Sequence, residues 1–378
     1  MGADKPHILH CHSTFSAGGK ELRCVQLINA MGRGVRHTIV SGDPQQLGAA
    51  ERIDRSIEVD LAPDFPALRG KPLPGRLLKL AQAMKPFDLV LTYNWGAMDV
   101  AMAHTLFSEA LGLPPLIHHE DGFNEDEADK RKKTRNWYRK IALGKTAALV
   151  VPSEKLEEIA LTEWEQPIGR VKRIANGIDI AAYRHDPAPD TLRVVKHEGE
   201  KWVGTLAGLR PVKRLPALVR AFADLPEEWQ LVILGEGPEK ERIRQTADEL
   251  EVGHRVHLPG YVADPSGVVG LFDIFALSSG SEQFPISVVE AMAAGRPVAA
   301  PAVGDVANMV SADNVPFITA IGDDAALASS LHTLAQDEAL RVIVGEANRQ
   351  HAERNYDQAA MIDAYRRLYS RAIGSEIA

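Results

Sequence analysis

Short apolar runs alternate with amphipathic stretches along most of this chain, and such alternation is typical of βαβ units with parallel strands. The apolar run at residues 7–12 predicts the first strand. A helix is expected to begin near Lys20, because apolar side chains recur there at helical spacing. These side chains are Cys24, Leu27, Ile28 and Met31. Further strands are predicted at residues 37–41, 88–93, 116–119 and 147–151.

The same pattern starts again in the second half of the chain. A strand is predicted at residues 201–206, followed by a loop at 207–214 and a helix with the same apolar spacing. The repetition favours two Rossmann-like α/β domains in series over one long doubly wound sheet. Further strands are predicted at residues 230–234, 256–258, 274–277 and 298–300.

Turn residues collect near residues 176–189, and we place the linker between the domains there. The sequence thus predicts an N-terminal domain over residues 1–180 and a C-terminal domain over residues 181–357. The last stretch is amphipathic and no predicted strand follows it. We therefore expect a helix at residues 358–373, with residues 358–378 packing back across the first domain.

Composition narrows the class of protein. Of the 378 residues, 45% are hydrophobic and 25% are charged, which is typical of a globular protein and not of a disordered chain or a coiled-coil rod. Two cysteines cannot form a disulfide framework, so a reducing compartment is predicted. No apolar run approaches the length of a membrane span, and the N-terminus lacks an apolar signal-peptide stretch. We predict a cytoplasmic protein.

The formal net charge of −8 is spread unevenly. The first 178 residues carry 24 Lys and Arg against 22 Asp and Glu, and the remaining 200 carry 19 against 29. Nucleic-acid binding requires clustered basic side chains for the phosphates, so nucleic acid is not an expected partner. The asymmetry indicates that the two halves bind different partners.

The most informative segment covers residues 279–297. Pro285 suits the first turn of a helix, and Gly295 and Pro297 end it. The N–H groups at the start of such a helix form a site for a diphosphate beyond the strand ends. Glu290, near the second turn, is placed to accept hydrogen bonds from ribose hydroxyls, and Glu282, in the preceding loop, from hydroxyls of a further group. The alternative is that Glu282 only complements the helix dipole and Glu290 is solvated.

Glu282 and Glu290 form an E-x7-E pattern followed by Ala-Met-Ala-Ala-Gly-Arg-Pro-Val. This resembles the donor-site signature of retaining GT-B glycosyltransferases of family 4, the group 1 glycosyl transferases. The resemblance covers nearly the whole chain. It includes the GGKE segment at 18–21, NGID at 176–179, GEGP at 235–238, LPGYV at 258–262 and the terminal YRRLY at 365–369.

The resemblance implies a GT-B fold, with two facing Rossmann-like domains, parallel sheets and a C-terminal helix that crosses back to the first domain. It also implies that the nucleotide-sugar donor binds mainly to the C-terminal domain and the acceptor to the N-terminal domain. The donor-binding residues would be Gly18, Gly19, Arg210, Lys213, Glu282, Gln283, Phe284, Pro285, Ile286, Ser287 and Glu290. The catalytic residues would be Glu282, Lys213, Arg210 and His119 or Asp121.

The sequence departs from the family pattern at several places, and before the NGID segment Ala175 replaces the usual Pro. Lys213 matches the family's phosphate-binding Lys, but Gly208 stands where the family has Arg, and Arg210 is the candidate replacement. Such cations stabilise a leaving diphosphate by charge-assisted hydrogen bonds. Gln283 replaces a common Gly and weakens the assignment of a particular donor. In the first domain, either His119 or Asp121 takes the position of the family's His; Asp121 could instead cap a helix from Glu125.

No metal or other cofactor is expected, because the sequence has no zinc-like ligand spacing and no convincing D-x-D pair. A basic stretch at residues 130–141 contains Trp137 and Tyr138. It could rest on an anionic membrane, which would suit a lipid-linked acceptor. The alternative, which we favour slightly, is a solvated helix face. Peripheral contact with the inner face of the membrane therefore stays an open alternative.

Taken together, the residues and the resemblance predict a retaining glycosyltransferase of the hexosyltransferase type. It would move a sugar from a UDP- or GDP-sugar to a hydroxyl of a glycan or lipid-linked acceptor, in bacterial surface polysaccharide synthesis. The alternatives are a non-catalytic GT-B partner subunit and a nucleotide-sugar epimerase. The E-x7-E pattern argues against both.

Overall fold

The computed structural model describes the chain except residues 1–4, 63, 124–126, 128–130, 186 and 378. Its described residues form two compact units. Unit 1 comprises Met1–Ala175 and Ala360–Ala378, and unit 2 comprises Asn176–Ala359. No helix in the described part of the chain is long and apolar enough to cross a membrane.

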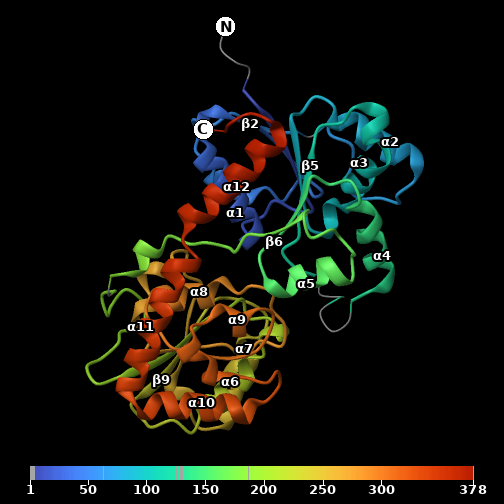
Figure 1. The fold of residues 1–378 in the computed structure, drawn as a ribbon. Coiled ribbons are helices and arrows are strands. Elements are labelled where there is room, and N and C mark those ends of the chain that lie inside the picture. Colours follow the sequence, from blue (N-terminus) through green and yellow to red (C-terminus); the bar gives the residue numbers. More distant parts are fainter. Residues whose placement is uncertain (1–4, 63, 124–126, 128–130, 186, 378) are drawn as a thin grey trace. The chain divides into compact units, whose positions relative to one another are not determined.

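Unit 1 is built on a seven-stranded parallel sheet with the strand order β3-β2-β1-β4-β5-β6-β7 (Figure 1). The order reverses direction beside β1, as in doubly wound sheets. The strands are β1 (His7–His12), β2 (Arg36–Ser41), β3 (Val59–Leu61), β4 (Leu89–Tyr93), β5 (Leu116–His119), β6 (Ala148–Val151) and β7 (Val171–Arg173).

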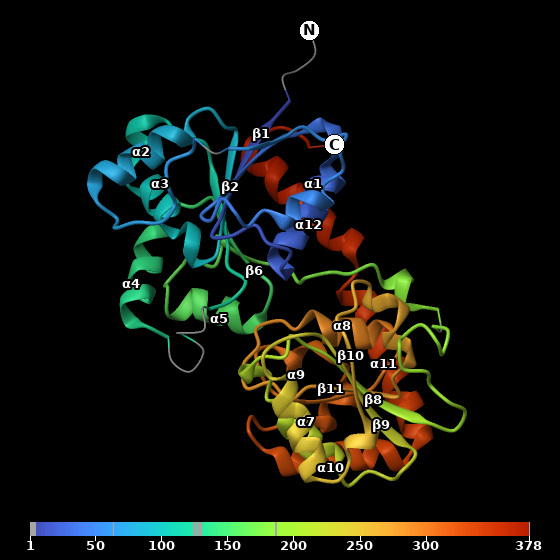
Figure 2. The same ribbon diagram turned by 180° about the vertical axis from the view of Figure 1, so that it is seen from behind.

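Helices cover both faces of this sheet. One buried cluster joins it to α2 (Pro74–Met84), α3 (Met98–Leu111), α4 (Lys133–Ala142) and α5 (Glu154–Thr162). The other joins it to α1 (Gly19–Met31) and to α12 (Gln358–Ile373), from the far end of the chain. Met361, Tyr365 and Tyr369 of α12 are buried there, so the last helix completes the core of the first unit. Helix α12 lies beside α1 (Figure 2).

Unit 2 repeats the plan with a six-stranded parallel sheet in the order β10-β9-β8-β11-β12-β13. The strands are β8 (Lys201–Leu206), β9 (Trp229–Leu234), β10 (Val256–Gly260), β11 (Ile274–Ala276), β12 (Val298–Pro301) and β13 (Ile318–Thr319). The helices are α6 (Leu215–Phe222), α7 (Lys240–Glu249), α8 (Ile286–Ala293), α9 (Val306–Met309), α10 (Asp324–Gln336) and α11 (Glu338–Asn355). Helix α6 packs against α7 and α10, and α8 packs against α11.

The predicted α/β fold with two parallel sheets and a returning last helix is confirmed. The strands at His7–His12, Leu116–His119 and Lys201–Leu206 match the predicted bounds. The sequence missed β3, β7 and β13, which have two or three residues each. Such edge strands contain too few residues to show a periodic pattern.

Helix α8 is positioned by a close backbone approach to α11. A Cβ atom added to Gly345 of α11 would lie 2.1 Å from the carbonyl oxygen of Gly295, which follows the last turn of α8. Only glycine lets the two backbones come this close.

We therefore predict that Gly345→Ala destabilises the protein although alanine is the better helix former. Propensity alone would stabilise α11 by about 1 kcal/mol, but the clash is with backbone and cannot be relieved by a rotamer change. The free energy of unfolding should fall by about 1–3 kcal/mol, as measured by urea denaturation. Gly267→Ala in the same unit is the control, because nothing lies within 4 Å of the added atom. A Gly345→Ala protein as stable as the wild type would contradict the packing described here.

Candidate functional site

The loop after β8 is shaped by the glycine-rich turn after β9. A Cβ at Gly235 would lie 1.9 Å from the carbonyl oxygen of Ala207, and one at Gly237 2.5 Å from that of Leu209. Both glycines also have positive φ angles, 145° and 156°. The amide of Leu209 donates to the carbonyl of Glu236 at 2.9 Å. The GEGP turn thus holds the loop that carries Arg210 and Lys213.

Lys213 and Glu282 form an ion pair in which Nζ contacts Oε1. The two residues come from loops after β8 and β11, which are tied together by hydrogen bonds. The amide of Gly280 donates to the carbonyl of Val212 at 2.8 Å. The hydroxyl of Ser278 donates to the carbonyl of Lys213 at 2.8 Å, and that of Ser279 to Glu282 Oε1 at 2.7 Å. The pair stands at the carboxyl edge of the sheet, where parallel α/β sheets bind ligands.

Both charged side chains are only 14% exposed. The Glu282 carboxylate neutralises the charge of Lys213 but does not use all of its hydrogen-bonding capacity, because an ammonium group has three N–H donors. An anion entering this edge can therefore share Lys213 with Glu282. The structure thus brings together two of the residues that the sequence analysis assigned to the donor site.

Arg210 is exposed in the same loop, and its side chain lies beside the glycine that precedes it by two residues. The ideal Cβ position of Gly208 is 3.6 Å from Arg210 Nε. The Arg210 side chain thus passes close to the point where an arginine at position 208 would begin. This placement favours Arg210 as the replacement for the missing family arginine.

The segment before α8 rests on a second tight backbone contact. Gly304 has φ = 57°, and a Cβ there would lie 2.6 Å and 2.5 Å from the carbonyl oxygens of Glu282 and Gln283. The amide of Asp305 donates to the Gln283 carbonyl at 3.1 Å. Because the carbonyl oxygens of Glu282 and Gln283 face Gly304, they point away from the start of α8.

Helix α8 begins directly after Pro285, which is buried, and among the described residues no side chain caps it. The amides of Ile286 and Ser287 therefore lie at an N-terminus without a side-chain acceptor, which is suited to an anion. Phe284 is held by an edge-to-face contact with Tyr356, with ring centroids 5.7 Å apart.

Glu290, in the second turn of α8, accepts a hydrogen bond from the hydroxyl of Tyr183 at 3.1 Å. Burial raises the pKa of Glu290 to about 7, and the Tyr183 bond opposes this shift. Tyr183 belongs to the short helix at Ile180–Tyr183, directly after the NGID segment. Sequence reasoning missed Tyr183, since nothing in the pattern near NGID marks a partner for a residue 107 positions away.

In unit 1, Gly18 and Gly19 lie at the start of α1 but have different surroundings. A Cβ at Gly18 would lie 2.7 Å from Glu21 Oε2, whereas nothing lies within 4 Å of one at Gly19. A side chain at position 18 would therefore displace the carboxylate of the buried Glu21 in the same motif. Gly19 leaves the backbone at the first turn of α1 open to approach.

His119 is fully enclosed in unit 1, with 1% of its surface exposed. Its Nε2 is 2.8 Å from the hydroxyl of Tyr369 in α12, and its Nδ1 is 3.3 Å from the carbonyl oxygen of Thr92. Burial holds the pKa of His119 well below its usual range, so the ring is neutral. Both ring nitrogens of His119 are thus engaged inside unit 1. The choice between His119 and Asp121 for the position of the family's His stays a prediction.

Asp121 follows β5 and forms a two-pronged ion pair with Arg23 of α1, one contact of which measures 2.9 Å. Its amide donates to Asn94 Oδ1 at 2.8 Å. Asp121 therefore joins three segments of unit 1. The helix start at Glu125 that Asp121 could cap lies outside the described residues.

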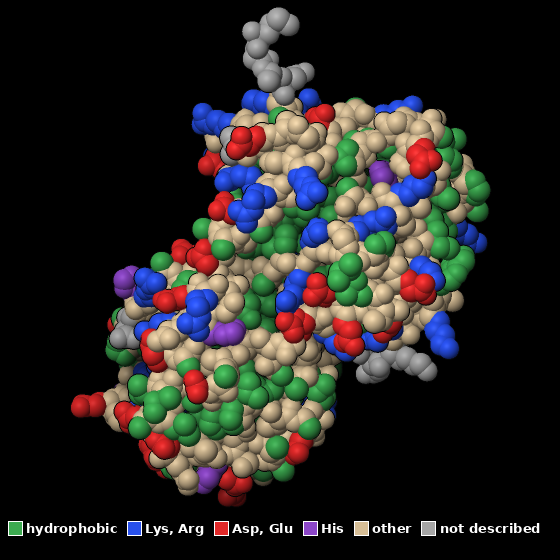
Figure 3. All heavy atoms as spheres, viewed as in Figure 1, with side chains coloured by type: hydrophobic (Ala, Val, Ile, Leu, Met, Phe, Trp, Pro, Cys, Tyr) green, Lys and Arg blue, Asp and Glu red, His purple; other side chains and the backbone are tan. Residues whose placement is uncertain are grey.

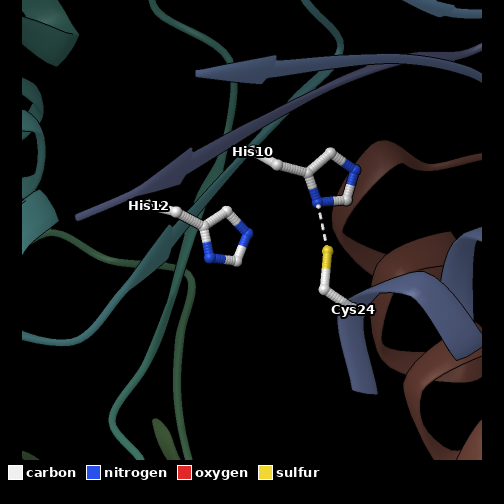
Figure 4. A group of neighbouring side chains, drawn as sticks. All are labelled: His10, His12 and Cys24. Atoms are coloured by element: carbon white, nitrogen blue, oxygen red, sulfur yellow. Dashed lines mark hydrogen bonds between the residues drawn. The ribbon is translucent and has the colours of Figure 1, made fainter. Parts of the chain in front are cut away.

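A buried group of His10, His12 and Cys24 brings three side chains of metal-ligand type within 4.8 Å of one another (Figure 4). The spacing of these residues along the sequence does not resemble a metal-binding motif. The fold brings them together, because His10 and His12 lie on one face of β1 and Cys24 comes from α1. Cys24 Sγ is 3.4 Å from His10 Nδ1, and His10 Nε2 is 3.0 Å from His37 Nδ1. These contacts form a hydrogen-bonded core network. The expectation that no metal is needed stays a prediction.

The basic stretch is largely neutralised within unit 1. Arg139 is fully buried between Glu120 and Glu127, Arg135 pairs with Glu127 at 2.9 Å, and Arg131 pairs with Glu163. Trp137 is 65% exposed. On the face shown in Figure 3, basic and acidic side chains are interspersed. The geometry favours a solvated, ion-paired helix face over a cationic membrane patch.

Comparison with known proteins places both halves in one family. The family model for glycosyl transferases group 1 matches residues 191–351, and that for glycosyltransferase family 4 matches residues 17–182. Together the two models match most of the chain.

Individual relatives agree with this. The N-acetyl-alpha-D-glucosaminyl L-malate synthase of Bacillus anthracis is 28% identical over 55% of this chain and 55% of that protein. The lipopolysaccharide core biosynthesis glycosyltransferase LpsD of Rhizobium meliloti is 28% identical over 50% of this chain and 56% of its own. This chain thus spans about half the length of these curated relatives.

The fold as a whole has solved counterparts. The Anabaena protein HepE in complex with UDP superimposes with a TM-score of 0.81 and 21% identity, covering 97% of this chain and 100% of that chain. The match shows a shared GT-B fold. With the two domain matches and the architecture in agreement, the chain belongs to the group 1 (family 4) glycosyltransferases of the GT-B fold.

Proposed function

We propose that this protein transfers a glycosyl group from a nucleotide-sugar to a hydroxyl group of an acceptor. The observation that carries the proposal is the carboxyl edge of the unit 2 sheet. There Lys213 pairs with Glu282. The loop that carries Glu282 leads into α8, whose start has no side-chain cap. A cation and a helix N-terminus at one edge suit a diphosphate.

The donor we propose is a UDP- or GDP-sugar. In this assignment the diphosphate binds Lys213, Arg210 and the amides of Ile286 and Ser287, and Glu290 accepts hydrogen bonds from the ribose. Solved structures of HepE contain UDP and UDP-glucose, which supports a uridine nucleotide as the first candidate. No metal or cofactor is part of the proposal.

We propose net retention at the anomeric carbon. The leaving diphosphate oxygen takes the proton of the acceptor hydroxyl on the face from which it departs, so no separate protein base is required. Lys213 and the α8 N-terminus stabilise the charge that develops on the diphosphate. When Lys213 turns to the diphosphate, Glu282 is released to accept hydrogen bonds from hydroxyls of the donor sugar.

The acceptor we propose is a glycan or a lipid-linked sugar in the synthesis of a bacterial surface polysaccharide, at the cytoplasmic side of the membrane. The relationship to LpsD supports this role. The intact Lys213–Glu282 pair argues against a non-catalytic subunit, because such a subunit has no need of a polarised cation at this edge.

Calorimetry with UDP-, GDP- and ADP-sugars tests the donor assignment directly. We expect one nucleotide class to bind, followed by slow hydrolysis of the nucleotide-sugar when no acceptor is present. Failure of all three classes to bind would refute the proposal.

Lys213→Met should lower the rate of donor turnover by about 10²–10³-fold, because a charge that stabilises the leaving group is lost. The measurement is release of free nucleoside diphosphate. Lys201→Met is the matched control, since Lys201 also pairs with a glutamate (Glu338, 3.7 Å) but lies at the opposite end of β8. Equal rates for the two variants would remove Lys213 from the mechanism.

Tyr183→Phe should weaken nucleotide binding by about three- to tenfold, because one hydrogen bond that orients Glu290 is lost.

The pH dependence of nucleotide affinity provides a second test. Glu290 ionises around pH 7, and the ionised carboxylate is the stronger acceptor for ribose hydroxyls. Affinity for the nucleotide should therefore rise from about pH 6 to about pH 8 more steeply in the wild type than in Glu290→Gln. Parallel pH curves for the two proteins would rule out the ribose role of Glu290.

A further inference from the structure

The core of unit 1 contains a cluster of metal-ligand side chains that the proposed transfer reaction does not use. His10 and His12 extend from β1, and Cys24 extends toward them from α1 (Figure 4). All three residues are buried, with at most 1% of their surface exposed. Imidazole nitrogens together with a thiolate sulfur are ligands that suit zinc(II) and copper(I) ions.

The distances in this cluster are those expected between the ligands of one ion. Cys24 Sγ lies 3.4 Å from His10 Nδ1, and the Tyr93 hydroxyl lies 3.2 Å from that nitrogen and 3.6 Å from the sulfur. Ligand atoms about 2.0–2.3 Å from a tetrahedral ion lie about 3.3–3.8 Å from one another. A ligand atom of His12 is within 4.8 Å of those of His10 and Cys24. A small movement of the His12 ring therefore completes a set of three ligands.

His12 is the member of the cluster that packing alone leaves unexplained. Neither of its ring nitrogens makes a hydrogen bond with any residue that the structure describes. Its ring is nevertheless fully buried, stacked on Tyr93 and in edge-to-face contact with Phe15. Buried polar atoms are nearly always paired, and an unpaired one calls for an explanation such as an ion. A metal ion between His12 and Cys24 gives this ring a partner.

His10 is oriented for the same role. Its Nε2 lies 3.0 Å from Nδ1 of His37, in the neighbouring strand β2. When Nε2 carries the proton and donates it to His37, Nδ1 is left to bind a metal. Metal-ligating histidines are commonly held by such a second residue, which fixes their tautomer. The contact between His10 Nδ1 and Cys24 joins two of the ligands, so a bound ion replaces it and leaves neither group unpaired.

We propose that His10, His12 and Cys24 bind one thiophilic metal ion in the core of unit 1. A thiol buried in the core keeps its proton until the ion arrives. On binding, the S–H bond of Cys24 breaks, the sulfur–metal bond forms and the proton passes to solvent. A monovalent ion thus leaves the charge of the buried cluster unchanged, whereas a divalent ion adds one uncompensated positive charge, which is costly in the core. Copper(I) is therefore the expected ion.

The proposed ion has a structural role. It ties β1 to α1, takes no part in glycosyl transfer and is independent of the transferase function proposed above. Its presence makes the stability of unit 1 depend on the metal, because an ion that binds only the folded chain stabilises it.

Metal retention by the full chain tests the proposal. The protein is loaded with copper(I) or zinc(II) under reducing, oxygen-free conditions, both as the folded chain and during refolding from urea, because the enclosed site closes as the chain folds. Loose metal is removed by a chelator and gel filtration, and the bound metal is measured by mass spectrometry. We expect about one copper ion per chain. Retention of zinc alone would support the site and reject copper(I) as its occupant, whereas retention of neither ion by either route would overturn the proposal.

Substitutions locate the bound ion. Cys24→Ala and His12→Phe should each lower metal retention at least about tenfold, because each removes one ligand. Cys11→Ala is the matched control, since Cys11 is also a buried cysteine but belongs to the core cluster on the other face of the sheet. Its metal retention should equal that of the wild type. Retention that survives Cys24→Ala, or that Cys11→Ala lowers equally, would refute the assignment.

His12→Phe also distinguishes a metal ligand from a residue that only packs. Phenylalanine keeps an aromatic ring on Tyr93 and removes two unpaired nitrogens. Without metal, this variant should therefore melt at or above the melting temperature of the wild type. Copper(I) should raise the melting temperature of the wild type and leave that of His12→Phe unchanged. Equal shifts in the two proteins would place the ion elsewhere and contradict the proposal.

Discussion

The carboxyl edge of the unit 2 sheet depends on backbone segments that approach more closely than any side chain would allow. Gly235 and Gly237 bring the turn after β9 onto the loop of Lys213, and Gly304 lies against the carbonyls of Glu282 and Gln283. These contacts fix two loops so that one lysine and one glutamate meet at the end of the sheet. An ion pair formed by flexible loops would lose much of its strength to side-chain and backbone entropy.

The geometry of unit 2 shows that the family's sequence motifs contain two kinds of residue. The glycines of the GEGP turn have positive φ angles and lie against carbonyl oxygens. The fold, and not a ligand, therefore excludes any larger residue at these two positions. Lys213 and Glu282, by contrast, are held in a position that the core does not require. The sequence motif thus combines residues that build the edge with residues that we propose to act there.

Local pattern predicted the main strands, the two-unit plan and the returning helix, because apolar periodicity is a property of neighbouring residues. The family resemblance also named Lys213 and Glu282 as donor-site residues, but not as partners in an ion pair. It did not reveal Tyr183 as the partner of Glu290, Arg23 as the partner of Asp121, or Tyr369 as the partner of His119. Each of these contacts joins distant parts of the chain, and spacing along the sequence carries no signal for it. The sequence also gives no sign that the fold encloses His119, one of the two candidates for the family's His position.

The helix α12 gives unit 1 a discontinuous sequence, with consequences for biosynthesis. Residues 176–359 of unit 2 are contiguous, whereas unit 1 needs residues 360–378 to cover the face that contains Tyr365 and Tyr369. During translation, the second unit is therefore complete before the first. Until the final helix emerges, His119 lacks its tyrosine partner, and the part of the sheet face that α12 covers beside α1 stays open to solvent. Although chains commonly fold from the N-terminal domain onward, here the first unit to appear on the ribosome is the last one able to finish folding.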